Sequence, residues 1–566
     1  MPSRVRTSDA GVPLLYGRGN RIFKENIVKR SLGLLALCLV LVVSLAGCQD
    51  SGDKQWEQKQ KAAIEGFLVA TNSTIKHDGL TVSAKDKSFT LKNVRGSFTV
   101  TVNEFVPVTK VEYSAGQLKG TGVNFVDTVP SGAMNFAAKV ALTNSTVKTS
   151  AITDNPLELS NTTAHYDTLT FSDVKGDFST FKAIASANPL TLEQRKGLLS
   201  FSMAEMSYAG YSSIVEMTSF ESLMQGKVNP ENPAMTIKSS AKGGWIKDVN
   251  ASGLGEHFAE ATKIFVDNAE VVHIDKTGGK AIRVPGFAEA VIQEKLNDDM
   301  IAKMNIELDT LYVDGVTISL PTGEKATLKY LDTSAKINRE ATSFAVALKS
   351  LVLPSSMTDM AGAAILLVQQ PLSSFHKQPL SFSGELNVAG ALNADKTAAD
   401  ITVNKIALAE DNLGGFAITA KLLAALSPDA GSTIMIDRME TPKISKFTLA
   451  LKDTGLLEFL FGVAAASGHS PVQGMEGNPG VMRHMVASGL TMVCMQAAPP
   501  FVDFCSDLAK YISEPNLFEL ALAPEAPLSV EMEPEALMLQ TPKTLGLTWK
   551  YTPPAPQVAP AAPAQK

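Results

Sequence analysis

The chain has 566 residues, 45% of them hydrophobic and 19% charged, so most of it should fold, with enough length for two or three domains. The first 30 residues carry a net charge of +5 in a chain whose total is −6, which leaves −11 on the rest. An acidic body argues against a nucleic acid as a partner.

An apolar segment follows the basic start. Residues 31–47 contain no charged side chain, and Lys29 and Arg30 come directly before them. A basic n-region (1–30) followed by an apolar h-region (31–47) is typical of an export signal. The first 27 residues are unusual for an n-region, and a start at Val28 would leave an ordinary one. The segment is also at the lower length limit for a membrane-spanning helix, which is the alternative interpretation.

The end of this segment, Leu45-Ala46-Gly47-Cys48, resembles the lipobox of bacterial lipoproteins. The resemblance implies cleavage between Gly47 and Cys48, a diacylglycerol on the Cys48 thiol and an acylated new amine. Several acyl chains, palmitate among them, would then hold the protein at a membrane of the cell envelope. Gln49 after the cysteine implies the periplasmic face of the outer membrane, with the inner membrane and the cell surface as alternatives. The resemblance covers about 20 residues and implies nothing about the rest.

Beyond the lipobox we expect a short tether and then a β-rich body. Residues 48–75 should form the tether, with a helix over Gln55–Val69. The alternative is that this helix simply packs on the body. Apolar and polar residues alternate in much of the segment 76–440, which is typical of strands with one buried face. We therefore expect a mainly β fold, an extended antiparallel sheet that forms a groove or a sandwich, with interspersed helices. Two of those helices are expected over His257–Ala269 and Phe287–Leu296, and a turn is expected at Asp314-Gly315.

Two stretches of this body echo each other 80 residues apart. Residues 89–99 (FTLKNVRGSFT) match residues 169–179 (LTFSDVKGDFS) in register. Each predicts a strand, a turn at the glycine and a second strand. The echo is either a duplicated β-unit or a convergence of two hairpins on similar turn chemistry. The pattern resembles the large, β-rich envelope families of the AsmA and YdgA kind, but no functional residue can be carried over from them.

The segment 441–551 should form an α+β domain. Helices are expected over Leu456–Ala466, Met482–Gln496 and Phe501–Ile512, and strands at Phe447–Leu451, Phe518–Leu522 and Leu545–Tyr551. Residues 552–566 are rich in Pro and Ala and predict an extended tail. Five methionines, Met475, Met482, Met485, Met492 and Met495, should mostly line a helical core, although Met-rich surfaces also bind partners or soft metals.

Two cysteines remain in the exported body. Cys494 and Cys505 should lie near the turn of a helical hairpin, and an oxidising envelope favours a disulfide between them. Two buried free thiols are the alternative.

Motifs that carry catalysis or metal binding are lacking in the sequence. No two of the seven histidines form a local metal pair, and no P-loop, G-x-S-x-G or dinucleotide-binding motif occurs. S-x-x-K occurs at Ser73, Ser145, Ser179, Ser239 and Ser374, which indicates background in a chain rich in Ser and Lys. We therefore predict no catalytic residue, metal or cofactor, and a non-catalytic protein that binds lipid or an envelope protein through a sheet surface. A structural or adhesive lipoprotein and a hydrolase with dispersed residues are the alternatives.

Overall fold

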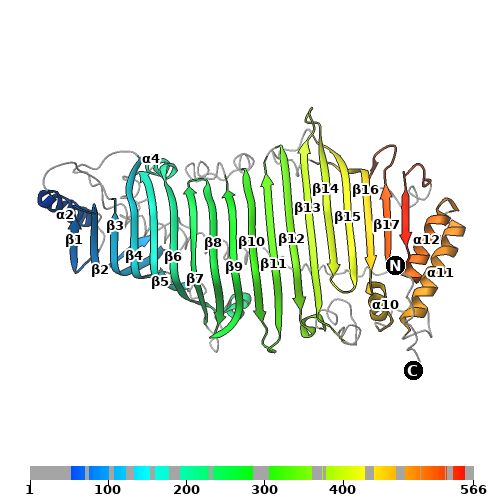
Figure 1. The fold of residues 1–566 in the computed structure, drawn as a ribbon, viewed down its shortest axis with the longest axis horizontal. Helices are drawn as coiled ribbons and strands as arrows, with labels where there is room; N and C mark the ends of the chain where they lie inside the picture. The colour runs from blue at the N-terminus through cyan, green and yellow to red at the C-terminus, as the bar shows by residue number, and fades with distance from the viewer. Residues whose placement is uncertain are drawn as a thin grey trace, which may run out of the picture. The chain divides into compact units, whose positions relative to one another are not determined.

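The chain is mainly β, and its strands pair antiparallel, which confirms the predicted fold class (Figure 1). The structure is a computed structural model. It describes residues 53–70, 75–100, 108–122, 133–152, 160–177, 192–228, 234–284, 305–338, 340–359, 373, 378–427, 439–466, 478–497, 499–529, 531 and 540–554. The helix expected over Phe287–Leu296 lies outside these residues, and so do residues 555–566 of the tail expected over 552–566.

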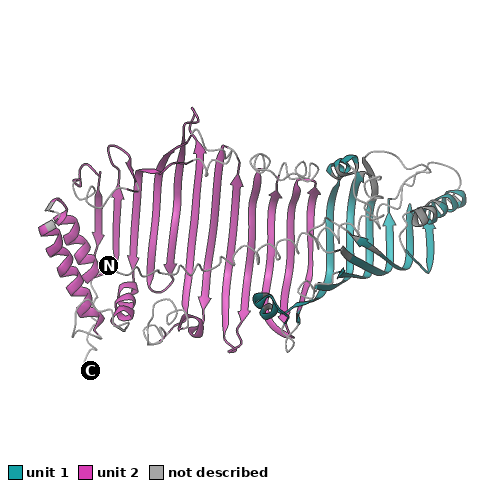
Figure 2. Cartoon of the chain, turned by 180° about the vertical axis from the view of Figure 1, so that it is seen from behind, with its two compact units in different colours: residues 1–236 teal, residues 237–566 magenta. Residues whose placement is uncertain are grey.

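The chain divides into two compact units, 1–236 and 237–566 (Figure 2). The division falls inside the segment 76–440, which the sequence treats as one body. Each unit contains an antiparallel sheet in which strands that follow one another along the chain are neighbours. This arrangement needs only short connections between strands.

The described part of unit 1 contains a helix where the sequence predicts one, followed by six strands. The helix α2 spans Asp53–Ala70, and its Ile64 and Gln60 side chains are buried. The strands are β1 (Gly79–Ser83), β2 (Ser88–Val100), β3 (Val108–Thr121), β4 (Ala133–Ile152), β5 (Ser160–Asp177) and β6 (Ser202–Thr218). Short helices α4 (Leu192–Gly197) and α5 (Phe220–Gln225) precede and follow β6.

Unit 2 contains a run of long strands. They are β7 (Ala234–Asn250), which starts just before the division, β8 (Gly253–Val266), β9 (Ala269–Arg283), β10 (Ile306–Ser319), β11 (Lys325–Ile337), β12 (Ala341–Leu353), β13 (Leu380–Leu392), β14 (Ala398–Glu410), β15 (Gly414–Ala425) and β16 (Lys443–Asp453).

The α+β segment at the end of unit 2 follows the sequence expectation closely. It contains the helices α10 (Leu456–Ala466), α11 (Pro479–Ala497) and α12 (Val502–Ser513), and the strands β17 (Leu517–Leu522), β18 (Leu528–Ser529) and β19 (Thr548–Thr552). The side chain of Phe518 in β17 is 2% exposed and packs against Phe504 and Tyr511 of α12, with ring centroids 5.9 and 5.6 Å away. Helix α12 thus covers one face of the sheet at β17 and β19.

Left-handed residues inside strands replace the turns that the sequence suggested. Asn93 and Asp173, which occupy the same place in the two echoing stretches, have φ of 49° each, but β2 and β5 run through them without a break. The predicted turns at the glycines that follow are therefore wrong. Asn and Asp tolerate the left-handed conformation better than most residues, so the chain kinks there without reversing.

These residues shift the alternation of side chains by one position. Leu91 and Val94 are both buried in β2, whereas Lys92 and Asn93 between them are both exposed. The register of the sheet places Asn93 in a row with Gly116, Asn144, Asp167 and Gly210 of the next four strands. Because every strand shifts at the same level, the pairing of the strands continues on both sides of the row.

Left-handed residues within strands also explain two wrong predictions in unit 2. Ala261 in β8 has φ of 50° and Gly315 in β10 has φ of 66°. The shift at Ala261 puts residues three positions apart on one face, which imitates a helical period in the sequence. His257–Ala269 is therefore not a helix but most of β8, a turn and the first residue of β9, and Asp314-Gly315 lies within a continuous strand.

The two units differ in how their strands are buried. In unit 1, large side chains such as Phe89, Leu118, Leu169 and Phe171 are at most 2% exposed. In β7 through β15 of unit 2 the buried hydrophobic residues are small, with Val403 the largest, namely Ala241, Ala326, Ala399, Val403, Ala420 and Ala424. The large aliphatic side chains of these strands are half-buried or exposed.

Candidate functional site

The predicted site residues fall in different parts of the chain. Gly47 and Cys48 lie outside the described residues, as does Met475. Cys494 in α11 and Cys505 in α12 form a disulfide, with Cα atoms 6.3 Å apart and both residues buried. Of the methionines of α11, Met482 is buried, whereas Met492 and Met495 are about 60% exposed, so the expectation of a mostly buried methionine core is correct only in part.

The disulfide closes the turn between α11 and α12, the helix that packs on β17 and β19. Replacing Cys494 and Cys505 by serine together should lower the free energy of unfolding of this segment by about 2–3 kcal/mol, because the unfolded chain gains entropy when the loop opens. Urea unfolding followed by hydrogen exchange in α12 measures the change. Reduced wild-type protein should match the double variant, and an unchanged midpoint in both would contradict the prediction.

The S-x-x-K pairs that the structure describes do not form sites. Ser145 is buried in β4 and Lys148 is exposed, and Ser239 and Lys242 likewise fall on opposite faces of β7. Residues three apart in a strand point to opposite sides unless a left-handed residue intervenes. These serines and lysines therefore cannot act on one substrate atom.

One face of the unit 2 sheet is aliphatic. Residues directly opposite each other in an antiparallel pair lie on the same face. One row of opposite residues connects Val313 to Leu331, Leu331 to Leu348, Leu348 to Gly384, Gly384 to Leu408 and Leu408 to Phe416. A second row connects Leu311, Thr333, Val346, Leu386, Ile406, Ile418 and Leu449. We call this side of β7 through β16 the apolar face.

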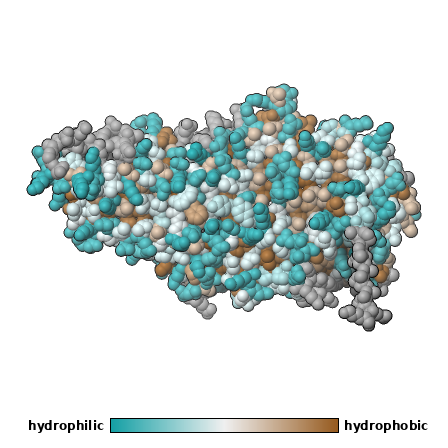
Figure 3. All heavy atoms as spheres, viewed as in Figure 1, coloured by the Kyte–Doolittle hydropathy of each residue, from teal (hydrophilic) through white to brown (hydrophobic). Residues whose placement is uncertain are grey.

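The apolar face carries exposed large side chains. Six large hydrophobic residues in β7 through β16 are exposed. Five of them lie on the apolar face, at 36–44% exposure: Ile306, Ile318, Phe344, Leu408 and Phe416. Only Leu423 lies on the other side, opposite Asp400. Hydrophobic residues reach the surface over β13 to β16 in Figure 3, among hydrophilic ones.

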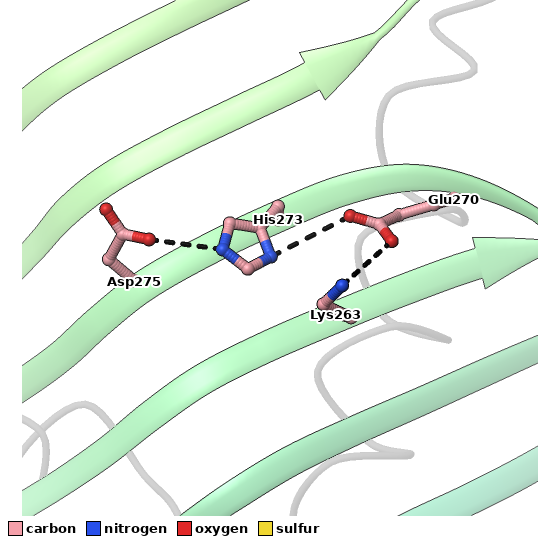
Figure 4. Close-up of polar contacts among 4 residues, drawn as sticks. All are labelled: Lys263, Glu270, His273 and Asp275. Carbon is pink, nitrogen blue, oxygen red and sulfur yellow. Dashed lines mark hydrogen bonds and ion pairs between the residues drawn. The ribbon is translucent and has the colours of Figure 1, made fainter.

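The opposite side, the polar face, carries charged pairs between neighbouring strands. Figure 4 shows His273 of β9 between two carboxylates, with Nε2 3.1 Å from Asp275 Oδ1 and Nδ1 3.7 Å from Glu270 Oε1. Lys263 of β8 donates to the other oxygen of Glu270 at 3.2 Å. Another pair joins Lys242 to Glu260 at 3.1 Å. All of these side chains are at least 30% exposed, so they are typical of a solvated sheet face.

The His-x-Asp arrangement of this cluster occurs in both units. In unit 1, His165 Nε2 lies 3.4 Å from Asp167 Oδ1, and Nδ1 is within 3.1 Å of Thr146 Oγ1. Each aspartate lies opposite a left-handed glycine of the next strand, Gly210 or Gly315. The match between residues 89–99 and 169–179 did not reveal this repeat. In each unit the histidine and aspartate lie on one strand and the glycine lies on the next.

A membrane-crossing helix and a metal cluster are both lacking in the part of the chain that the structure describes. None of the described helices combines the length and hydropathy that a crossing requires. Nor do three or more His, Cys, Asp or Glu side chains in the described ranges converge as metal ligands.

Comparison with known proteins adds one match. A family model described as "Uncharacterized protein" matches residues 385–552, within unit 2. No curated protein and no solved structure matches the chain. The match covers strands of the apolar face from β13 onward together with the α+β segment.

Proposed function

We propose that this chain is a lipid-anchored protein of the bacterial cell envelope that binds lipid acyl chains on the apolar face of unit 2, without catalysing a reaction. The observation that carries the proposal is the position of the exposed large hydrophobic residues of β7 through β16, all but one of which share a face. Soluble proteins rarely leave a contiguous apolar surface of this kind without a binding partner.

The chemistry of the apolar face favours acyl chains over other apolar ligands. Its side chains in β10 through β16 are mainly Leu, Ile and Val, which offer no donors or acceptors along a hydrocarbon chain. A strand of 13 residues, such as β12, spans about 43 Å. That length exceeds the ~15 Å that the acyl chains of one bilayer leaflet occupy, so a whole chain can lie along the strands.

The anchor supports the same proposal. Acylation of Cys48 would hold the protein beside a bilayer, where lipid is available to the apolar face. Replacing Cys48 by serine should abolish incorporation of labelled palmitate and release the protein from the membrane fraction, because only the thiol forms the thioether. Cys38→Ser, in the same apolar segment, is the matched control and should keep the label. Label retained in the Cys48 variant would contradict lipidation at this residue.

Lipid binding is tested by extraction of the full chain in mild detergent and mass spectrometry of the lipids that copurify. We expect the wild-type chain to carry lipid, and the triple variant Ile318→Gln, Phe344→Gln and Leu408→Gln to carry several-fold less, because each amide interrupts contact with hydrocarbon. Leu423→Gln changes a similarly exposed leucine on the polar face and should retain wild-type lipid. Wild-type protein free of lipid, or equal lipid in all variants, would contradict the proposal.

A further inference from the structure

The apolar face is not uniform. In β10 through β16 it is mainly aliphatic, and in β7 through β9 it keeps aliphatic residues at Ile246, Ile264, Val272 and Ile274. Among these lies a second region of small and hydroxyl-bearing residues with one histidine, formed by Ala241, Gly244, Ala259, Thr262, Thr277, Gly279 and His257. The face therefore has a large hydrocarbon-like region and a smaller region of low relief that can form hydrogen bonds, like the two parts of a lipid.

His257 is the group of this second region that can form the strongest hydrogen bonds. It lies opposite Ile246 of β7 and Gly279 of β9, and Gly279 lies opposite Leu311, the first residue of the aliphatic row. The imidazole is thus at the border between the two regions. Its Nδ1 is fully buried and has no hydrogen-bond partner among the residues that the structure describes. A buried polar atom without a partner is uncommon and suggests that a ligand or water supplies one.

Gly279 makes room for the ring. A Cβ at this position would lie 2.5 Å from Cε1 and 2.9 Å from Nδ1 of His257, closer than side chains approach one another. The imidazole therefore lies flat across β9, toward β10, and not out from the sheet. Any larger residue at position 279 would force the ring away from the aliphatic region.

The charges around His257 are on the other side of the sheet. The lysines and carboxylates of β7 through β9 that form ion pairs, including Lys242, Glu260 and Lys263, belong to the polar face. None of the described positions that share the apolar face with His257 in these three strands is Lys, Arg, Asp or Glu. A phosphate bound there would have no fixed counter-charge.

From this juxtaposition we propose that His257 binds the headgroup of a lipid whose acyl chains lie on β10 through β16, and that this headgroup is uncharged, as in a diacylglycerol. The inference rests on the proposed function and names the ligand class for the same surface. Burial lowers the pKa of His257 below its ordinary value, so the ring is neutral at neutral pH. A neutral imidazole both donates and accepts, which suits a hydroxyl or an ester.

The test uses the full chain and three probes: hexadecane, dioleoylglycerol and dioleoylphosphatidic acid. The two lipids share their acyl chains and differ by a phosphate, and hexadecane has no headgroup. We expect wild-type protein to take up hexadecane and to retain dioleoylglycerol at least tenfold better than dioleoylphosphatidic acid. His257→Leu should lose about tenfold in dioleoylglycerol retention, the equivalent of one hydrogen bond, and keep hexadecane uptake. His257→Asn keeps a donor and an acceptor and should recover part of the loss.

Each outcome is decisive. A wild-type chain that takes up none of the probes overturns the proposed function and this inference together. Normal hexadecane uptake with unchanged dioleoylglycerol retention in His257→Leu overturns the role of His257 alone. Equal retention of the two lipids by wild-type protein overturns the uncharged headgroup. Loss of hexadecane and dioleoylglycerol to the same extent in His257→Leu shows a structural role for the ring and also overturns the inference.

Discussion

Replacing Phe518 by alanine should destabilise the C-terminal part of unit 2 by about 3–5 kcal/mol, the usual cost of removing a buried phenylalanine. The ring is 2% exposed and packs against Phe504 and Tyr511, so the variant leaves a cavity between α12 and the sheet. Hydrogen exchange of β17 and α12 during urea unfolding isolates this segment from the other unit.

Phe416→Ala is the matched control for that variant. Phe416 lies on the same side of the sheet as Phe518, since both are opposite Leu451, but it is 36% exposed. Part of its surface is already in contact with solvent or ligand, and we expect a loss of only about 1–2 kcal/mol in the lipid-free chain. Equal losses for Phe416→Ala and Phe518→Ala would show that α12 does not seal the sheet at β17.

Gly315→Ala should cost about 3 kcal/mol or more, because two effects add at this position. Gly315 has φ of 66°, a conformation that costs an L-residue roughly 1–2 kcal/mol, and its Cβ would overlap the Asp275 side chain on β9. The strands β9 and β10 must move apart where Gly315 faces Asp275. Chemical unfolding followed by hydrogen exchange in β9 and β10 measures the loss.

Gly323→Ala separates the two effects. Gly323 has φ of 86° but no atom within 4 Å of its would-be Cβ, so only the conformational cost, about 1–2 kcal/mol, is expected. Adding Asp275→Ala to Gly315→Ala should recover part of the difference, because it removes the carboxylate from the overlap. Equal losses at Gly315 and Gly323 would mean that the space between Gly315 and Asp275 tolerates a side chain, and that packing does not require the glycine.

The alternation of apolar and polar residues predicts most strands. Helix boundaries can be predicted where glycine and proline residues flank the helix. Leu456–Ala466 has the predicted bounds, since Gly455 precedes a mainly apolar run and a Gly- and Pro-rich stretch follows it. His257–Ala269 failed because Ala261 shifts the alternation. An alanine with positive φ has no local signal, and only the register with β9 shows why the chain adopts it.

The candidate site is less accessible from sequence than the fold. Each strand shows that it has an apolar side, but the shifts at Gly315 and Ser350 hide which residues share a face across the sheet. His257 is an isolated histidine in the sequence. Its place beside Gly279 depends on the pairing of residues 22 positions apart. Cys48 is the reverse case, since its motif is local and entirely readable.

The most direct test of acyl-chain binding is photo-crosslinking of the full chain with a fatty acid that carries a diazirine near the end of its chain. Peptide mapping then locates the labelled residues. Binding on the apolar face predicts label at Leu348 and Leu408 and little at their neighbours Ala347 and Ala407, which point to the polar face. Label on the polar-face residues, or spread evenly over both faces, would contradict the proposed function.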